Sequence, residues 1–172
     1  QPRSGYFVTV ESLAIGSTTV NSTSIPANQV MELATASPYL NVSSIILQNL
    51  NDTLTAKRVG AVVQYEGLLC LDYSQQPTPT VDYLQAFPLL TFAFSGGAAF
   101  EVGPEAYVQR QDGGTTAAGA VYCALIIPLA NSGQPWRLGA PAMRGHWIEA
   151  DMDEGVVRFS ARNTECKDVQ LQ

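Results

Sequence analysis

The chain has 172 residues, of which 46% are hydrophobic and 14% are charged, and its formal net charge is −6. This composition excludes a disordered acidic tail and suffices for one hydrophobic core, so we expect a single domain over residues 1–172. The 9 Lys and Arg residues form no basic patch, being scattered singly apart from Lys57-Arg58. Nucleic acid and membrane surfaces are therefore not expected as partners.

Most of the predicted elements are β-strands, so the fold class expected is mainly β. Runs rich in β-branched and aromatic residues alternate with glycine-containing turn signals, which is typical of strands. In chain order, strands are predicted at residues 6–15, 59–65, 89–94, 98–102, 121–127, 147–151 and 156–160. The turn Asp153-Glu154-Gly155 between the last two predicts a β-hairpin.

One longer helix and one short helix complete the predicted elements. The longer helix follows Ser43, which suits an N-cap. Its apolar residues fall at helical spacing on one face, as expected for a helix that lies on a sheet: Ile46, Leu47, Leu50 and Leu54. The short helix is predicted at residues 141–146, with Pro141 in its first turn.

The start of the chain and its sequons indicate a secretory route. Residues 1–5 show neither an initiator Met nor a signal-peptide pattern, which predicts a processed chain cut from a longer precursor. Three N-glycosylation sequons begin at Asn21, Asn41 and Asn51. We expect a glycan on one or more of them and a secreted protein, extracellular or vacuolar.

The chain has 3 cysteines, an odd number that implies a free thiol or a bond to another chain. Cys70 and Cys123 both lie in strand-like apolar runs, so two strands of one sheet can hold them at bonding distance. Closing that loop stabilises the fold by roughly 4 kcal/mol in the chain-entropy model. Cys166 lies in a polar tail and is expected to form an interchain disulfide, with an unpaired thiol as the second interpretation.

Motifs near the end of the chain resemble the C-terminal lobe of pepsin-like aspartic proteases. Leu138-Gly139 precedes the short predicted helix, and residues 148–160 form the predicted hairpin with aspartates at its turn. Both are similar to motifs of that lobe, in which a hydrophobic-hydrophobic-Gly motif opens a short helix and a hairpin closes the lobe. The resemblance covers almost the whole chain and implies a pepsin-like fold.

Within that family, the chain is most similar to the plant secreted branch of endoxylanase inhibitors, gamma-conglutin seed globulins and extracellular dermal glycoproteins. Residues 5–16 resemble the opening strand of these proteins, and residues 35–40 resemble the stretch that occupies the place of a lost catalytic turn. A cysteine after Phe159-Ser160 is also shared. The resemblance implies that Cys166 joins this lobe to an N-terminal lobe or large chain.

The chemistry of a pepsin-like lobe depends on one short turn, which here reads Leu33-Ala34-Thr35-Ala36-Ser37. It resembles hydrophobic-Asp-Thr-Gly-Ser with alanine in place of both the aspartate and the glycine. Catalysis needs an aspartate from each lobe, and Ala34 has no ionisable group, so we expect no enzyme activity. Glu32 lies on the same strand face but starts about 6 to 7 Å from the required place, which makes it a poor substitute.

Other catalytic or binding chemistry has little support in the sequence. The three cysteines are more than forty residues apart and form no metal-ligand spacing, so no metal and no cofactor is expected. His146 is the single histidine and enters a predicted strand, where a structural role is favoured over membership of a catalytic triad.

Three functional hypotheses follow. In the first, the lobe inhibits a microbial cell-wall glycoside hydrolase, a xylanase or an endoglucanase. The endoxylanase inhibitors place a histidine shortly before their last cysteine, which this chain lacks; Arg162 can pair with catalytic carboxylates instead, or lie solvated in the tail. The alternatives are a storage or structural globulin of the gamma-conglutin type and, third, an active aspartic protease.

Overall fold

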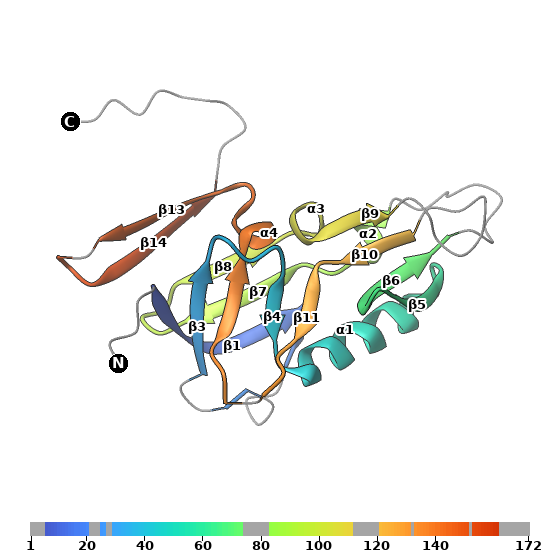
Figure 1. Ribbon diagram of the computed structural model, residues 1–172, viewed down its shortest axis with the longest axis horizontal. Helices are drawn as coiled ribbons and strands as arrows, with labels where there is room; N and C mark the ends of the chain where they lie inside the picture. The colour runs from blue at the N-terminus through green and yellow to red at the C-terminus, as the bar shows by residue number, and fades with distance from the viewer. Residues whose placement is uncertain are drawn as a thin grey trace.

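The computed structural model describes residues 6–20, 25–26, 29–73, 83–111, 121–131, 133–151 and 153–161. These residues form three β-sheets, with one long helix along one side (Figure 1). The mainly β fold expected from the sequence is confirmed, and it is consistent with a pepsin-like C-terminal lobe.

The largest sheet has the strand order β11-β4-β12-β3-β1-β7-β8, with β2 paired to β1. It mixes the two orientations, because β12 runs parallel to β3 and β11 runs parallel to β4. Its strands are β1 Phe7–Ile15, β2 Thr18–Thr19, β3 Gln29–Ala34, β4 Leu40–Val42, β7 Leu90–Phe94, β8 Ala99–Val102, β11 Ile126–Pro128 and β12 Trp136–Gly139.

A second sheet has the order β5-β6-β10-β9 and contains a disulfide. Its strands are β5 Ala61–Tyr65, β6 Leu68–Asp72, β9 Val108–Gln111 and β10 Val121–Ala124. Cys70 and Cys123 lie directly opposite each other on β6 and β10, and their sulfur atoms are bonded, as the sequence predicted. Both are fully buried in a small apolar cluster with Leu68, Val121 and Leu125.

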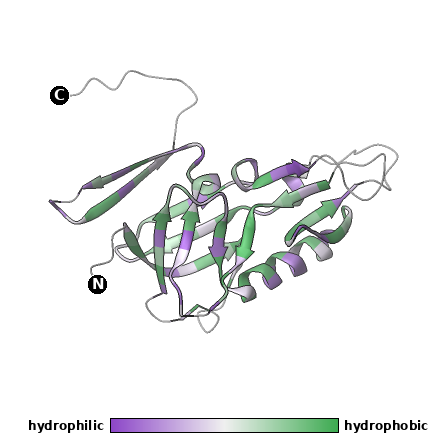
Figure 2. Cartoon of the chain, in the orientation of Figure 1, coloured by the Kyte–Doolittle hydropathy of each residue, from purple (hydrophilic) through white to green (hydrophobic). Residues whose placement is uncertain are grey.

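The long helix α1, Ser44–Lys57, lies beside β11 and β5. Ser43 is its N-cap residue, as predicted, although its hydroxyl makes no capping hydrogen bond. Figure 2 shows hydrophilic and hydrophobic segments alternating along α1, as expected for a helix with one buried face. Ile46, Leu50 and Leu54 supply that face and join the main core. Three short helices are α2 Tyr83–Ala86, α3 Pro104–Tyr107 and α4 Ala140–Met143.

The third sheet is the predicted hairpin, β13 His146–Asp151 and β14 Val156–Ala161. Its burial alternates with period two, so that Ile148 and Phe159 are partly buried against the core while Trp147 is 67% exposed. Gly155 has a φ of 66° in the turn, a conformation that glycine adopts without steric cost.

The structure corrects two predicted boundaries. The strand expected at residues 121–127 is divided at Leu125, because β10 pairs in the four-stranded sheet and β11 in the large one. Leu125 donates its N–H to Tyr107 and accepts from Leu40, so the chain changes partners there without losing hydrogen bonds. The helix expected at residues 141–146 covers Ala140–Met143, since Gly145 follows with a φ of 80° and His146 already belongs to β13.

Candidate functional site

The turn that carries Ala34 arches over the end of another strand. β3 ends at Ala34, β4 begins at Leu40, and β12 lies between these two strands (Figure 1). In the parallel pairing, Gly139 of β12 lies opposite Ala34. A strand from about a hundred positions later in the sequence is thus inserted beneath the connection, and we call this arrangement, residues 34–40 with β12, the threaded turn.

Backbone and hydroxyl hydrogen bonds hold the threaded turn in place. The Ser37 N–H donates to the Ala34 carbonyl oxygen, and the Ala140 N–H donates to the Ser37 carbonyl oxygen, both at 2.8 Å. The Ser37 hydroxyl donates to the Tyr39 carbonyl oxygen at 2.9 Å and lies 3.3 Å from Oδ1 of Asn41. The turn is therefore tied both to itself and to the segment that passes beneath it.

Gly139 makes this close passage possible. A Cβ atom at this position would lie 2.1 Å from the Tyr39 carbonyl oxygen and 2.7 Å from the Ser37 carbonyl oxygen. Its φ of −80° is open to any residue, so the requirement is for space and not for a special backbone conformation. The Leu138-Gly139 motif singled out in the sequence thus has a direct steric reason.

Residues 34–37 of the threaded turn carry hydroxyl groups but no ionisable side chain. Ala34 is half-buried, Thr35 and Ala36 are exposed, and Ser37 is engaged with its own turn. Acid or base chemistry needs a group that binds and releases a proton near the working pH, and residues 34–37 supply none.

Glu32 is the nearest predicted alternative, and it already has a partner. Burial along β3 alternates, so Glu32 and Ala34 share the less buried face, as expected from the sequence. Its carboxylate lies 3.1 Å from Nε of Arg137, the residue opposite it on β12. An ion pair at this point favours a role in strand pairing over a displaced catalytic carboxylate.

The remaining predicted site residues are dispersed. Asn41 lies in β4 and Asn51 in α1, whereas Asn21, Arg162 and Cys166 lie outside the described residues. The described residues contain no group of three or more His, Cys, Asp or Glu side chains that could hold a metal ion.

His146 packs on the core and has no catalytic partner among the groups that contact it. Its ring lies 4.5 Å from the ring of Phe100, centroid to centroid, and its Nδ1 is 3.2 Å from the Arg144 carbonyl oxygen. These contacts fit the structural role that the sequence favoured.

Sequence reasoning missed a surface pocket next to this histidine. The pocket has a volume of about 340 Å³, and its lining includes Glu101, Glu105, Arg144 and His146. The contributing segments are distant in the sequence, so no local motif could have indicated it.

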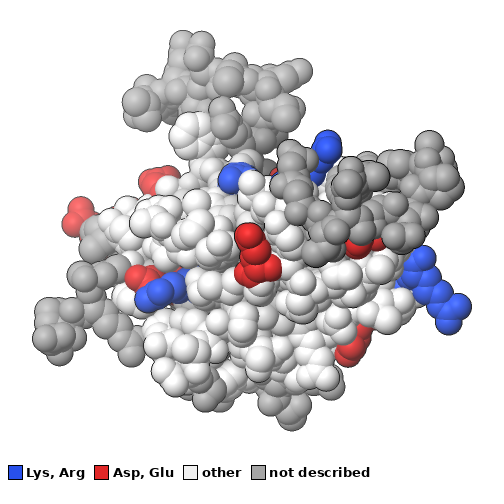
Figure 3. Space-filling view, turned by 45° about the vertical axis from the view of Figure 1, so that its right-hand side comes forward, with Lys and Arg blue, Asp and Glu red and all other residues white. Residues whose placement is uncertain are grey.

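On the face drawn in Figure 3, charged residues are scattered among many uncharged ones, and no basic patch is seen.

Two properties of the chain bear on its cellular setting. Among the described residues, no helix has both the length and the apolar character that crossing a membrane requires. The buried disulfide between Cys70 and Cys123 is compatible with a secreted protein, because such bonds persist in oxidising compartments.

Comparison with known proteins agrees with the fold. A search of curated protein sequences finds no match to this chain. A family model described as xylanase inhibitor C-terminal matches residues 5–161, which is most of the chain and includes every strand and helix described above. The chain therefore belongs to the family of pepsin-like xylanase inhibitor C-terminal domains.

Proposed function

We propose that this chain is one lobe of a secreted, proteolytically inactive, aspartic-protease-like glycoprotein that inhibits microbial cell-wall glycoside hydrolases, xylanases or endoglucanases. The observation that carries the proposal is the threaded turn. Its hydrogen bonds and its closely packed Gly139 are present, while Ala34 offers no group for proton transfer. Together with the family match, this favours a binding function on a protease-like scaffold.

Absence of proteolysis is the first expectation to test. A pepsin-like site shares one proton between two carboxylates, and this lobe contributes no free carboxylate at residues 34–37. The purified full-length protein is expected to leave a denatured protein substrate intact between pH 3 and 5. Cleavage that pepstatin blocks would instead support the active-protease hypothesis.

Inhibition requires a surface that reaches into an enzyme cleft. Loops and chain ends on a rigid β scaffold are suited to this, because the scaffold limits the entropy lost on binding. Arg162 follows β14 directly and offers a guanidinium group, which pairs strongly with the two carboxylates of a glycoside hydrolase. We therefore propose Arg162 as a target contact.

The decisive experiment measures inhibition of a panel of microbial xylanases and endoglucanases. We expect at least one to be inhibited, and the substitution Arg162→Ala to weaken that inhibition 10-fold or more. Arg110→Ala is the matched control, because Arg110 is an exposed residue of β9, at the opposite end of the molecule from β13 and β14 in Figure 1. Failure to inhibit any hydrolase at micromolar excess would favour the storage-globulin hypothesis.

The proposal also includes a second chain or lobe held by Cys166. Because Cys70 and Cys123 pair with each other, Cys166 remains as the odd cysteine of the chain. A non-reducing gel of the native protein is expected to show a larger species that reduction separates. An unchanged band would remove the two-chain form of the proposal and leave the inhibition assay unaffected.

A further inference from the structure

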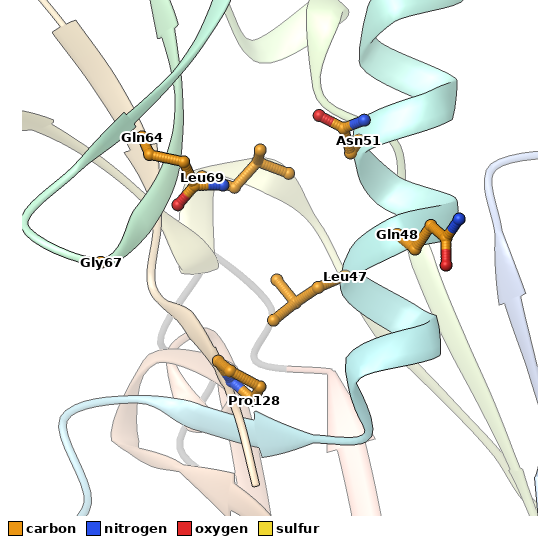
Figure 4. A pocket seen from close by; sticks show the side chains of 7 residues that line it. All are labelled: Leu47, Gln48, Asn51, Gln64, Gly67, Leu69 and Pro128. Carbon is orange, nitrogen blue, oxygen red and sulfur yellow. The ribbon is translucent and has the colours of Figure 1, made fainter. Parts of the chain in front are cut away.

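A pocket of about 300 Å³ lies between α1 and the hairpin of β5 and β6 (Figure 4). Leu47 of α1 and Leu69 of β6 point toward each other across it, and Pro128 of β11 closes its lower side in this view. Gln64 and Asn51 add polar groups to the wall. The pocket thus joins α1 and the hairpin that follows it to β11, a strand from much later in the sequence.

Asn51 is also the first residue of the sequon Asn51-Asp52-Thr53. We propose that Asn51 carries an N-linked glycan and that the first sugar, an N-acetylglucosamine, lies in this pocket. The inference rests on the secretory setting of the proposed function but not on inhibition.

The side chain of Asn51 is available for such a bond. Its Nδ2 is 3.5 Å from the Asp52 carboxylate, an exposed contact at the limit of hydrogen bonding. In the modification, Nδ2 forms a bond to the anomeric carbon of the oligosaccharide and loses one proton. The bond between that carbon and a lipid-linked diphosphate breaks, and the diphosphate is the leaving group.

The composition of the pocket suits a sugar. One face of a pyranose ring presents C–H groups, which pack on aliphatic side chains such as Leu47, Leu69 and Pro128. The hydroxyl and acetamido groups need hydrogen-bond partners, and the Gln64 amide offers both a donor and an acceptor. The volume is at the small end of ligand pockets and fits one sugar unit better than a larger ligand.

Asn41 provides the contrast within the same chain. It lies in β4, between β11 and β12, and its Oδ1 is 3.3 Å from the Ser37 hydroxyl of the threaded turn. A glycan there would extend over a face already occupied by the ion pair of Glu32 and Arg137. Asn51 instead stands at the wall of a pocket, so a seated sugar there would connect α1 to β6 and β11.

The test starts with the full-length protein from a eukaryotic secretory host. Glycopeptide mass spectrometry is expected to find a glycan on Asn51, and Asn51→Gln is expected to remove its mass. After the glycan is trimmed to a single N-acetylglucosamine, the unfolding temperature of the wild type should lie about 2 to 4 °C above that of Asn51→Gln. A rise of this size is expected for one added packing contact in a domain of this length. An unmodified Asn51 would overturn the inference.

Two controls separate the seated sugar from the change of side chain. The same pair made in a host without glycosylation should unfold at nearly the same temperature. Gln64→Ala, at an exposed position, should remove at least half of the rise in unfolding temperature that the glycan produces. In the protein without the glycan, the same substitution should change the unfolding temperature little. If Asn51 carries a glycan that does not raise the unfolding temperature, or if Gln64→Ala leaves that rise unchanged, the proposed position of the sugar in the pocket is overturned. Neither result bears on the inhibition assay.

Discussion

The threaded turn and the hairpin of β13 and β14 are built in opposite ways. In the threaded turn, β12 passes between β3 and β4, and the backbone at Gly139 leaves no space for a methyl group. The hairpin pairs only with itself among the described residues and presents Trp147 and Val156 to solvent. The threaded turn is closely packed but has no ionisable group at residues 34–37, whereas the hairpin exposes apolar side chains on two paired strands.

The difference indicates what each region contributes. Close packing around a turn without an ionisable group serves the fold, because it fixes the centre of the large sheet. Exposed apolar side chains at the edge of the molecule contribute little to stability and are available to a partner. In this family member, we expect mutations at the threaded turn to affect folding and mutations on the outer hairpin face to affect association.

The largest effect is expected at Gly139. Gly139→Ala forces a Cβ against the carbonyl oxygens of Tyr39 and Ser37, and neither the turn nor β12 can move without breaking the Ala140 to Ser37 hydrogen bond. We expect a loss of about 3 kcal/mol in the free energy of unfolding, measured by urea denaturation.

Gly133→Ala is the matched control, since nothing lies within 4 Å of a Cβ at that position. We expect its free energy of unfolding to change by less than about 0.5 kcal/mol. Equal stability of the Gly139 and Gly133 variants would mean that the turn does not pack on β12 as described.

The same comparison shows what the sequence could predict. The hairpin and α1 are local elements, so two strand-like runs around the turn Asp153-Glu154-Gly155 and a helical spacing after Ser43 were enough to predict them. The disulfide followed from two cysteines in strand-like runs. The turn at Ala34 was found only through its resemblance to a family motif.

The strands around the turn were not predicted, and the reason is physical. β3 includes the polar residues Gln29 and Glu32, β4 has only 3 residues, and β12 contains Gly139. The local preference of each segment for the strand conformation is therefore weak. They become strands because β12 pairs with β3 across a long sequence separation. Tertiary pairing of this kind leaves no periodic signal, and the pocket beside Asn51 depends on it in the same way.

A second, smaller effect distinguishes the two faces of the hairpin. Phe159 lies on the inner face, with its ring 5.3 Å from that of Phe94 and 4.7 Å from that of Phe100. Phe159→Ala should lower the free energy of unfolding by about 2 kcal/mol, which is less than the loss typical of truncating a fully buried phenylalanine. Trp147→Ala removes a larger ring from the outer face and should change the free energy of unfolding by less than about 0.5 kcal/mol.

Urea denaturation of both variants checks this difference, and near-ultraviolet circular dichroism verifies that the remaining aromatic rings keep their packing. If Trp147→Ala is the more destabilising of the two, Trp147 is buried by another part of the protein in solution. The outer face would then no longer be free for a partner, and the contrast between the two regions would fail.

The smallest effect concerns the response of the two regions to acid. The Asp151 carboxylate accepts hydrogen bonds from the backbone N–H groups of Glu154 and Asp153, at 3.0 and 3.1 Å, and pairs with Arg158 at 3.4 Å. These contacts, the Glu154 N–H first among them, hold the pKa of Asp151 below its ordinary value.

The sign follows from linkage. A carboxyl whose pKa is lower in the folded state contributes stability above the ordinary pKa of about 4, and loses it as the pH falls through the lowered folded value. The side-chain carboxyl carbon of Asp151, followed by NMR, should therefore titrate with a midpoint below the ordinary aspartate pKa of about 4. In Asp151→Asn, which keeps the acceptor oxygen without the charge, the part of the acid response of the Asp153 and Glu154 amide signals that comes from Asp151 should disappear.

The threaded turn is the internal reference in the same titration. Its hydrogen bonds join backbone groups and the Ser37 hydroxyl, and residues 34–37 carry no ionisable side chain, so the amide signals of Ser37 and Ala140 should move less than those of Asp153 and Glu154. Titration of Asp151 at or above its ordinary pKa would contradict the hairpin network. A strong acid transition at Ser37 would mean that a carboxyl group acts on the turn, which is the property that a protease would need and that Ala34 cannot supply.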